Sequence, residues 1–216
     1  PAAYFPNTAL AATRVRNCWF QCVNLGYSWS MRLGVEYKGT YEECTGGDYA
    51  FGGTGTASGT FTNCTGGGGA FGGKGTASGI FRDCKGVQNS FGQVASGIFI
   101  NCTGGDNAFG GESGTASGTA SGTFHNCTGG DGAFGFDGTA SGTFTNCTGG
   151  RSAFGCFGTA SGTFLNCTGG DSAFGCDGTA SGTFTHCQAR TNSFGGPTGT
   201  APGGKFYYCS ALTSSF

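Results

Sequence analysis

Charged residues are scarce in this chain: Asp, Glu, Lys and Arg make up 10% of its 216 residues, and the formal net charge is −1. The chain therefore lacks the basic surface expected of a protein that binds nucleic acid or an acidic membrane. Proline is also rare, with four residues, and no Gly-X-Y period is present, so the 48 glycines do not form a collagen-like triple helix. No apolar run is long enough to span a bilayer, and the first residues lack the basic start and apolar centre of a signal peptide. We expect neither nucleic-acid binding nor membrane insertion.

Phenylalanine and cysteine are abundant, and they recur in phase. Ten cysteines each have an aromatic residue three positions earlier and another seven positions later, although successive cysteines lie 18 to 25 residues apart. A pattern with a period near 20 residues is typical of a solenoid whose coils stack on one another, and a disordered chain would not keep its aromatics in register. The column consists of Cys22, Cys44, Cys64, Cys84, Cys102, Cys127, Cys147, Cys167, Cys187 and Cys209, and the aromatics that follow are Trp29, Phe51, Phe71, Phe91, Phe109, Phe134, Phe154, Phe174, Phe194 and Phe216.

Residues 138–154, GTASGTFTNCTGGRSAF, illustrate one coil. Alternation from 140 to 145 predicts a single strand that buries Ala140, Gly142 and Phe144 and exposes the Ser and Thr residues between them. We expect the small residues of this wall to leave room for a facing column of Phe. A bend or left-handed residue at Asn146 would reset the phase and let Cys147 point inward as well, because Asn tolerates that conformation. Each coil should thus contain two or three short strands.

These features predict an all-β, single-domain parallel β-helix of about ten coils over residues 15–216, right-handed by the usual crossover preference. Residues 1–14 match no coil and are expected to form a cap or linker. One coil is shortened at 92–95 and another is lengthened at 114–122, which predicts a surface loop at that point of the coil. The last coil ends on Phe216, a core position, so we expect another chain or further sequence to cover it.

The single-file spacing of the ten cysteines favours buried, reduced thiols that act as small hydrophobic side chains. Cys156 and Cys176 stand apart, because each follows the glycine after a core Phe, one coil from the other. A Cα separation of about 5 Å would permit a disulfide between them, although two adjacent free thiols are the simpler interpretation. No Cys or His spacing suggests zinc, and we predict no metal or cofactor.

Two repeated patterns, the Asn-Cys-Thr sequons and a column of Asp residues, have both a functional and a structural interpretation. Five Asn-Cys-Thr sequons occur, but the bend explains their Asn, and glycans on adjacent coils would crowd each other. An interrupted Asp column could suggest calcium, yet the alternation of Asp131, Arg151 and Asp171 is explained by an exposed charge ladder. The sequons lie at Asn63, Asn101, Asn126, Asn146 and Asn166, and the Asp column contains Asp48, Asp106, Asp131 and Asp171.

Glycoside hydrolysis would need two carboxylates facing one cleft. The pairs Asp131/Asp171 and Asp137/Asp177 each lie two coils apart, about 9–10 Å, but no aromatic cleft or deviating loop singles out either pair. His125 and His186 have no nucleophile arranged around them.

The outward Thr-x-Thr steps resemble an ice-binding face, but Ile, Arg, His and Leu interrupt the array, and Thr is a good outward strand residue.

The run GTASGTFTNCTGG, with its repeated Phe, resembles the repeats of parallel β-helix proteins. Among these it is most similar to structural proteins of phages and other viruses, such as tail fibres and spikes, and to bacterial surface adhesins. The resemblance covers roughly residues 15–216. It implies an extended, usually trimeric shaft that builds a virion or contacts a host, and it transfers no catalytic residue, since no matching motif is present.

We therefore expect a structural shaft or fibre module, not an enzyme, located in a virion or at an extracellular or cell surface. Its partners would be other structural chains, as a homo-oligomer such as a trimer or as the continuation of a longer fibre, and a host-surface glycan is a further candidate. The alternatives are a bacterial adhesin repeat, an ice-binding solenoid and a polysaccharide-degrading β-helix enzyme. A column of reduced thiols favours folding in a reducing compartment, as for virion proteins, over export through an oxidising route.

Overall fold

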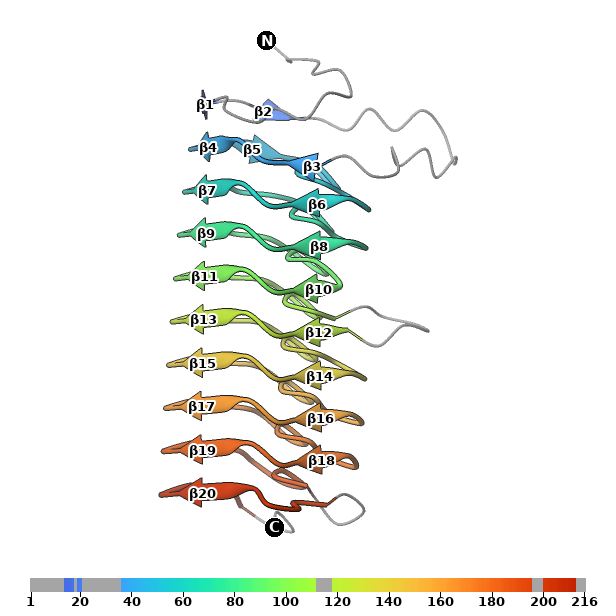
Figure 1. The fold of residues 1–216 in the computed structure, drawn as a ribbon, viewed down its shortest axis with the longest axis vertical. Coiled ribbons are helices and arrows are strands. Elements are labelled where there is room, and N and C mark those ends of the chain that lie inside the picture. The colour runs from blue at the N-terminus through green and yellow to red at the C-terminus, as the bar shows by residue number, and fades with distance from the viewer. Residues whose placement is uncertain (1–13, 18, 21–35, 112–117, 196–199, 213–216) are drawn as a thin grey trace.

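The computed structural model describes residues 14–17, 19–20, 36–111, 118–195 and 200–212, and it shows short parallel strands stacked down one long axis (Figure 1). Every regular element within these ranges is a strand, and no helix there could span a membrane. An all-β parallel solenoid with a period of about 20 residues is thereby confirmed. The predictions made for residues 1–13, Cys22, Trp29, residues 114–117 of the loop at 114–122 and Phe216 lie outside the described residues.

Two long parallel sheets form the walls of the shaft, and a short pair of strands lies beside them. The ten-stranded sheet contains, in spatial order, β1 (Arg14–Arg16), β4 (Thr40–Glu42), β7 (Thr60–Thr62), β9 (Ile80–Arg82), β11 (Ile98–Ile100), β13 (Thr123–His125), β15 (Thr143–Thr145), β17 (Thr163–Leu165), β19 (Thr183–Thr185) and β20 (Lys205–Tyr207). The eight-stranded sheet contains β18 (Thr179–Ala180), β16 (Thr159–Ala160), β14 (Thr139–Ala140), β12 (Thr119–Ala120), β10 (Val94–Ala95), β8 (Thr76–Ala77), β6 (Thr56–Ala57) and β3 (Glu36–Tyr37), and the third sheet pairs β2 (Trp19–Phe20) with β5 (Thr45–Gly46).

The register is the one that the repeat predicts, since each core residue pairs with its equivalent one coil away. Phe144 of β15 pairs with Phe124 on one side and with Phe164 on the other. The same holds for Ala140 in the eight-stranded sheet. Isolated bridges extend the pattern to the rest of the coil, for example between Thr148 and Thr168 and between Phe154 and Phe174.

The prediction of one continuous strand from 140 to 145 is wrong. The chain forms two strands, β14 and β15, which belong to different sheets and are separated by a bend at Ser141 and Gly142. Both amides of this bend donate to the carbonyl of Ala120 in the preceding coil, at 3.0 and 3.1 Å. The polar groups that the bend removes from a strand ladder are therefore paired between coils, which makes the corner regular.

The glycine at this corner is also required for a different reason from the one expected. A Cβ on Gly142 would lie 2.2 Å from the carbonyl oxygen of Gly122, and one on Gly162 would meet Gly142 in the same way. The three atoms nearest to each such Cβ belong to the backbone of the preceding coil, not to a facing Phe ring. Glycine therefore occupies this column because two neighbouring backbones approach closely.

The second corner lies at the residue before each core cysteine, and here the prediction of a left-handed residue is confirmed. Asn146 has φ 54°, and every described residue in the column has a similar value, including His186 at 53°. The exposed amides also form a ladder, in which Asn146 Nδ2 donates to Asn126 Oδ1 at 3.1 Å and Asn166 Nδ2 donates to Asn146 Oδ1 at 3.2 Å. This bend turns the cysteine inward beside the core Phe.

Two aromatic ladders fill the interior. Within a ladder the rings stack almost face to face, as Phe144 does on Phe164 with centroids 4.8 Å apart and planes 3° from parallel. Between ladders they meet edge to face, as Phe144 and Phe154 do at 5.7 Å and 84°. The ladder predicted to follow the cysteines is fully buried and consists of Phe51, Phe71, Phe91, Phe109, Phe134, Phe154, Phe174 and Phe194.

Replacing Gly142 with Ala should lower the free energy of unfolding by about 1–3 kcal/mol, because the new methyl group would press on a backbone that cannot rotate away. Gly47→Ala is the matched control, since a Cβ at Gly47 meets no atom within 4 Å. Chemical denaturation of the two variants and the parent chain measures both effects. Equal stabilities for the two variants would show that the close approach at the corner does not restrict this column.

Candidate functional site

The cysteine column lies inside the shaft, beside the aromatic ladders. The Cys147 side chain is fully buried, and its Sγ lies 3.5 Å from the carbonyl oxygen of Phe124 and 3.4 Å from that of Thr145. These acceptors satisfy the weak thiol donor, which behaves as a small core residue. Cys22 lies outside the described residues, Cys209 is half-buried, and the buried members are Cys44, Cys64, Cys84, Cys102, Cys127, Cys147, Cys167 and Cys187.

Near the C-terminal end of the column, the Cys187 thiol is kept protonated by its surroundings. Hydrogen bonding to the neighbouring Cys167 thiol and then burial raise the pKa of Cys187 above its ordinary value. A protonated thiol is a poor nucleophile and a poor metal ligand, because both roles need the thiolate. Cys187 is thus suited to packing rather than to reaction.

Cys156 and Cys176 are both buried free thiols on the opposite turn of the coil. Cys156 Sγ donates to the carbonyl oxygen of Cys176 at 3.6 Å, and no disulfide joins the two residues in the structure. Burial raises the pKa of Cys156 to about 12. The two residues are neighbouring thiols in this structure, and the possible disulfide between them stays a prediction.

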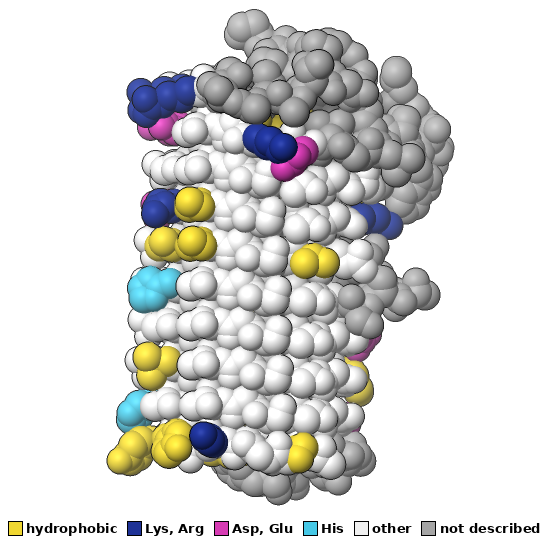
Figure 2. All heavy atoms as spheres, viewed as in Figure 1, with side chains coloured by type: hydrophobic (Ala, Val, Ile, Leu, Met, Phe, Trp, Pro, Cys, Tyr) yellow, Lys and Arg dark blue, Asp and Glu magenta, His cyan; other side chains and the backbone are white. Residues whose placement is uncertain are grey.

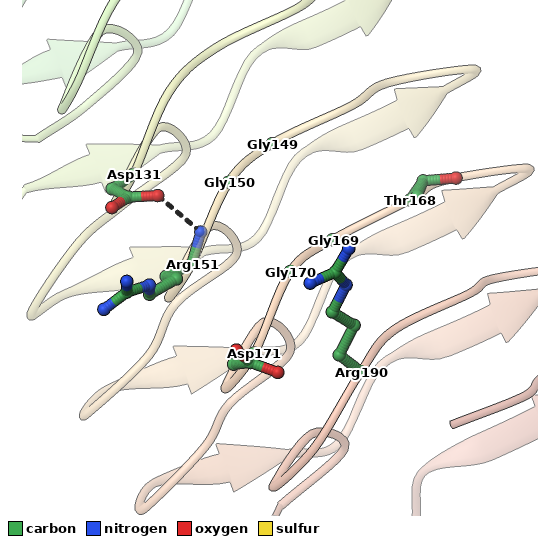
Figure 3. A pocket seen from close by; sticks show the side chains of 9 residues that line it. All are labelled: Asp131, Gly149, Gly150, Arg151, Thr168, Gly169, Gly170, Asp171 and Arg190. Carbon is green, nitrogen blue, oxygen red and sulfur yellow. Dashed lines mark hydrogen bonds between the residues drawn. The ribbon is translucent and has the colours of Figure 1, made fainter. Parts of the chain in front are cut away.

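A shallow hollow of about 430 Å³ lies on the turn that follows the cysteine column (Figure 3). Its floor is the glycine backbone at 149–150 and 169–170, which has no side chains to fill the space. Asp131 and Asp171 line it from one column, and Arg190 reaches toward the glycines of the preceding coil (Figure 3). Arg151 and Thr168 complete the lining, so the hollow is polar and carries charges of both signs.

The carboxylates of this turn bind the backbone of the next coil. Asp131 Oδ1 accepts the main-chain N–H of Arg151 at 2.7 Å, and Asp106 Oδ1 accepts that of Asp131 at 2.9 Å. Asp48 does the same for the amide of Gly68 at 2.7 Å. The exposed charge ladder expected for Asp131, Arg151 and Asp171 is therefore not the main interaction. The main interaction is a hydrogen bond from a main-chain amide to the Asp carboxylate of the preceding coil. It does not depend on the side chain of the residue that donates the amide, so Asp can recur even where the equivalent residue of the following coil is uncharged.

Asp171 illustrates the consequence for acid–base chemistry. It accepts hydrogen bonds from the Thr191 hydroxyl at 2.9 Å and from the Thr191 amide at 3.3 Å. These two bonds, with smaller contributions from Arg190 and Arg151, lower the pKa of the Asp171 carboxyl. A general acid for glycoside cleavage needs a raised pKa, so Asp171 is poorly suited to that role in the pair Asp131/Asp171.

The other carboxylate pair has a neighbour that sequence reasoning missed. Phe157 occupies the position between Asp137 and Asp177 in successive coils, and 59% of its surface is exposed. Its ring meets that of Phe136 edge to face, with centroids 6.4 Å apart. From the sequence no aromatic cleft was found at Asp137 and Asp177, and the exposed aromatic side chain that stands between them was overlooked. The signal was present in the sequence, because all three residues stand two positions after the glycine that follows a core Phe.

The remaining candidates lie on the outward face of the ten-stranded sheet and at its edge. Figure 2 shows a largely uncharged face, with histidine, basic and hydrophobic side chains gathered mainly along one side. His125 is exposed in the Thr column, while His186 stacks on Tyr208 at 4.9 Å. Leu165 and Ile98 are also exposed and interrupt the Thr grid that an ice-binding face would need. The sequon residues are exposed at the left-handed corner, where the Asn ladder accounts for their side chains from Asn101 to Asn166.

In the described ranges, no three His, Cys, Asp or Glu side chains come together in an arrangement that could hold a metal ion. Comparisons of the chain with protein-family models, with curated proteins and with solved structures give no match. The stacked parallel solenoid is a property of the structure itself. The resemblance to viral fibres and adhesins rests on the repeat sequence alone.

Thiol labelling should distinguish the buried cysteines of the column from the half-buried Cys209. Under native conditions, iodoacetamide should modify half-buried Cys209 before Cys147 and Cys167, which become reactive only on denaturation. Peptide mapping by mass spectrometry after timed labelling measures each site separately. Rapid native labelling of Cys147 or Cys167 would contradict the inward assignment of the column.

Asp171→Asn should remove a stabilising contribution that depends on pH. Because folding lowers the pKa of Asp171 below its ordinary value of 3.8, the contribution is present above about pH 4 and is lost as the pH falls through the folded-state pKa. The stability gap between parent and variant should therefore be present at pH 7 and narrow toward pH 2, as measured by urea denaturation. A gap of constant size would assign the effect to packing instead of charge, and Thr191→Val tests the hydroxyl partner independently.

Proposed function

We propose that this chain is a structural shaft module of a virion fibre or spike, or of a comparable extracellular assembly, and that it acts through its shape and surface. The observation that supports the proposal is the unbroken stacking of the aromatic ladder from Tyr41 to Phe206. Its eight steps have centroids 4.7–4.9 Å apart, which gives a ladder about 39 Å long.

In such a stack, the length of the shaft is proportional to the number of coils. Each coil binds its neighbours through the same ring contacts and the same parallel hydrogen bonds, so a coil can be added without a new kind of interface. In the sequence, the shortening at 92–95 and the lengthening at 114–122 both fall between a core Phe and the next Ala-Ser-Gly segment. These are the properties that a spacer of defined length requires.

The cysteine chemistry favours a virion component over an exported adhesin repeat. A column of buried free thiols remains chemically homogeneous when the chain folds in a reducing cytoplasm, whereas an oxidising export route would expose the unfolded thiols to mispairing. The expected partners are other structural chains, either copies of this chain or neighbouring segments of a fibre. Contact with a host-surface glycan would use the outward columns.

The modular character can be tested by changing the number of coils. Insertion of four copies of residues 139–158 after residue 158 preserves the Gly-Thr junction and should lengthen the shaft by about 19 Å. Deletion of the half-coil 139–148 is the control, and it should abolish cooperative unfolding because it breaks the ladders. Small-angle X-ray scattering measures the longest dimension, and circular dichroism follows folding.

A screen for polysaccharide cleavage by the parent chain tests the main alternative. Lengthening without cleavage supports the shaft. A chain that degrades a glycan and loses that activity in Asp137→Asn or Asp131→Asn would overturn the structural proposal in favour of a β-helix enzyme.

A further inference from the structure

The turn after the second Phe ladder departs from the repeat over three successive coils. In earlier coils this turn is Gly-Thr-Gly at 53–55 and Gly-Lys-Gly at 73–75. In the later coils it becomes Phe-Asp-Gly at 136–138, Cys-Phe-Gly at 156–158 and Cys-Asp-Gly at 176–178. Side chains thus replace glycine in the first position of all three turns, while Asp, Phe and Asp stand in the second.

Phe157 combines a positive φ with an exposed aromatic side chain, as Tyr208 does at the other corner of the coil. Its φ is 59°, in the left-handed region, where Asp137 and Asp177 in the adjacent coils have φ 53° and 52°. Asp tolerates this conformation, whereas a bulky aromatic residue adopts it only rarely. The ring remains 59% exposed, so burial does little to offset the unfavourable backbone. A requirement outside the fold would account for a phenyl ring at this position.

The three residues form one line along the shaft. The amide of Asp137 donates to the carbonyl of Cys156 at 3.2 Å, and the amide of Phe157 donates to that of Cys176 at 2.8 Å, so the three turns are in register. One coil rise separates Phe157 from each Asp, and the backbones of the two Asp residues are therefore about 10 Å apart. Phe136, in edge contact with Phe157, supports the ring from the side of the first coil.

The charges of this line have one sign. The turns at 136–138, 156–158 and 176–178 contain two carboxylates and no Lys or Arg. The face of a phenyl ring carries partial negative charge and attracts a cation, and carboxylates on both sides add to that attraction. With their backbones about 10 Å apart and Phe157 between them, the two Asp residues are poorly placed to bind one metal ion, whose oxygen ligands lie about 2.3–2.6 Å away. A larger organic cation, which contacts the ring and is attracted by both acids, fits the arrangement.

We propose that Asp137, Phe157 and Asp177 form a binding site for an alkylammonium group, such as a lysine side chain or a quaternary ammonium ion. The ring supplies a cation–π contact, and the two carboxylates supply the opposite charge. Phe136 holds the ring in place. The site lies on the side of the shaft, so a bound partner leaves the stacking of the coils unchanged.

The test uses the full chain and two cationic probes, tetramethylammonium chloride and N-acetyl-lysine methylamide, with sodium chloride matched for ionic strength. Titration followed by ¹⁵N–¹H NMR should shift the amides of residues 136–138, 156–158 and 176–178. tert-Butanol, a neutral probe of similar shape to tetramethylammonium, and maltose, a neutral sugar, should leave these amides unshifted.

Variants separate the ring from the charges. Phe157→Asn keeps a residue that tolerates positive φ and should weaken binding about twofold to fivefold, the effect expected for an exposed cation–π contact. Asp137→Asn should also weaken binding, and both effects should decrease in high salt. Leu165→Thr, which restores the residue of adjacent coils at another exposed apolar position, should bind like the parent chain.

Thermal unfolding of Phe157→Asn should show a stability equal to or above that of the parent, which separates lost binding from lost folding. Unchanged affinity in both Asn variants would overturn the proposal. Shifts of the same amides by maltose but not by tetramethylammonium would also overturn it and would indicate a neutral glycan site. Neither result affects the shaft proposal, which depends on the length of the stack.

Discussion

The equal rise of about 4.8 Å between coils is the constraint on which the whole structure depends. At that spacing, flat rings in one column stack face to face, as Phe144 and Phe164 do, and a second column meets them edge to face. Any residue in a column therefore has its own equivalents as neighbours above and below. A residue type whose side chains pack well against one another in adjacent coils stabilises every coil. A residue type that packs poorly destabilises each coil in which it occurs. Among the described residues, the buried side chains are accordingly those of Phe, Tyr41, Cys and Ala, with Ser90, Asn107 and Ser193 as the polar exceptions.

The corners of the coil obey the same rule through their polar groups. At the Ser-Gly bend, two amides share the carbonyl of the Ala in the preceding coil. At the left-handed corner, Asn amides bond from coil to coil, and at the glycine turn a carboxylate accepts the next main-chain N–H. None of these groups finds its partner within its own coil. The backbone is satisfied only in the stack, so a lone coil would leave these groups to water and would not bury its rings.

Because the interior and corners are satisfied by repetition, the outward columns are free to vary. Most remain Thr or Ser, but departures cluster in particular coils, such as the aliphatic residues Ile98 and Ile100 of β11 and the aromatic and acidic line around Phe157. A change in one outward column leaves the ladders intact, because the side chain points away from the stacked rings. Specific recognition can therefore be placed on a shaft of this kind without redesigning its core.

The sequence by itself determined the period, the parallel stacking, the two Phe ladders, the inward cysteines and the left-handed Asn corner, because periodicity and the conformational preference of Asn are properties of the chain alone. It did not determine that residues 140–145 divide between two sheets, since alternation looks the same in a straight and in a bent segment. The reason for Gly142 and the role of Asp131 depended on atoms of the adjacent coil. The meeting of Phe157 with Phe136 depended on it as well. Only the tertiary structure decided these points, because they arise from distances between coils and not from the order of residues within one.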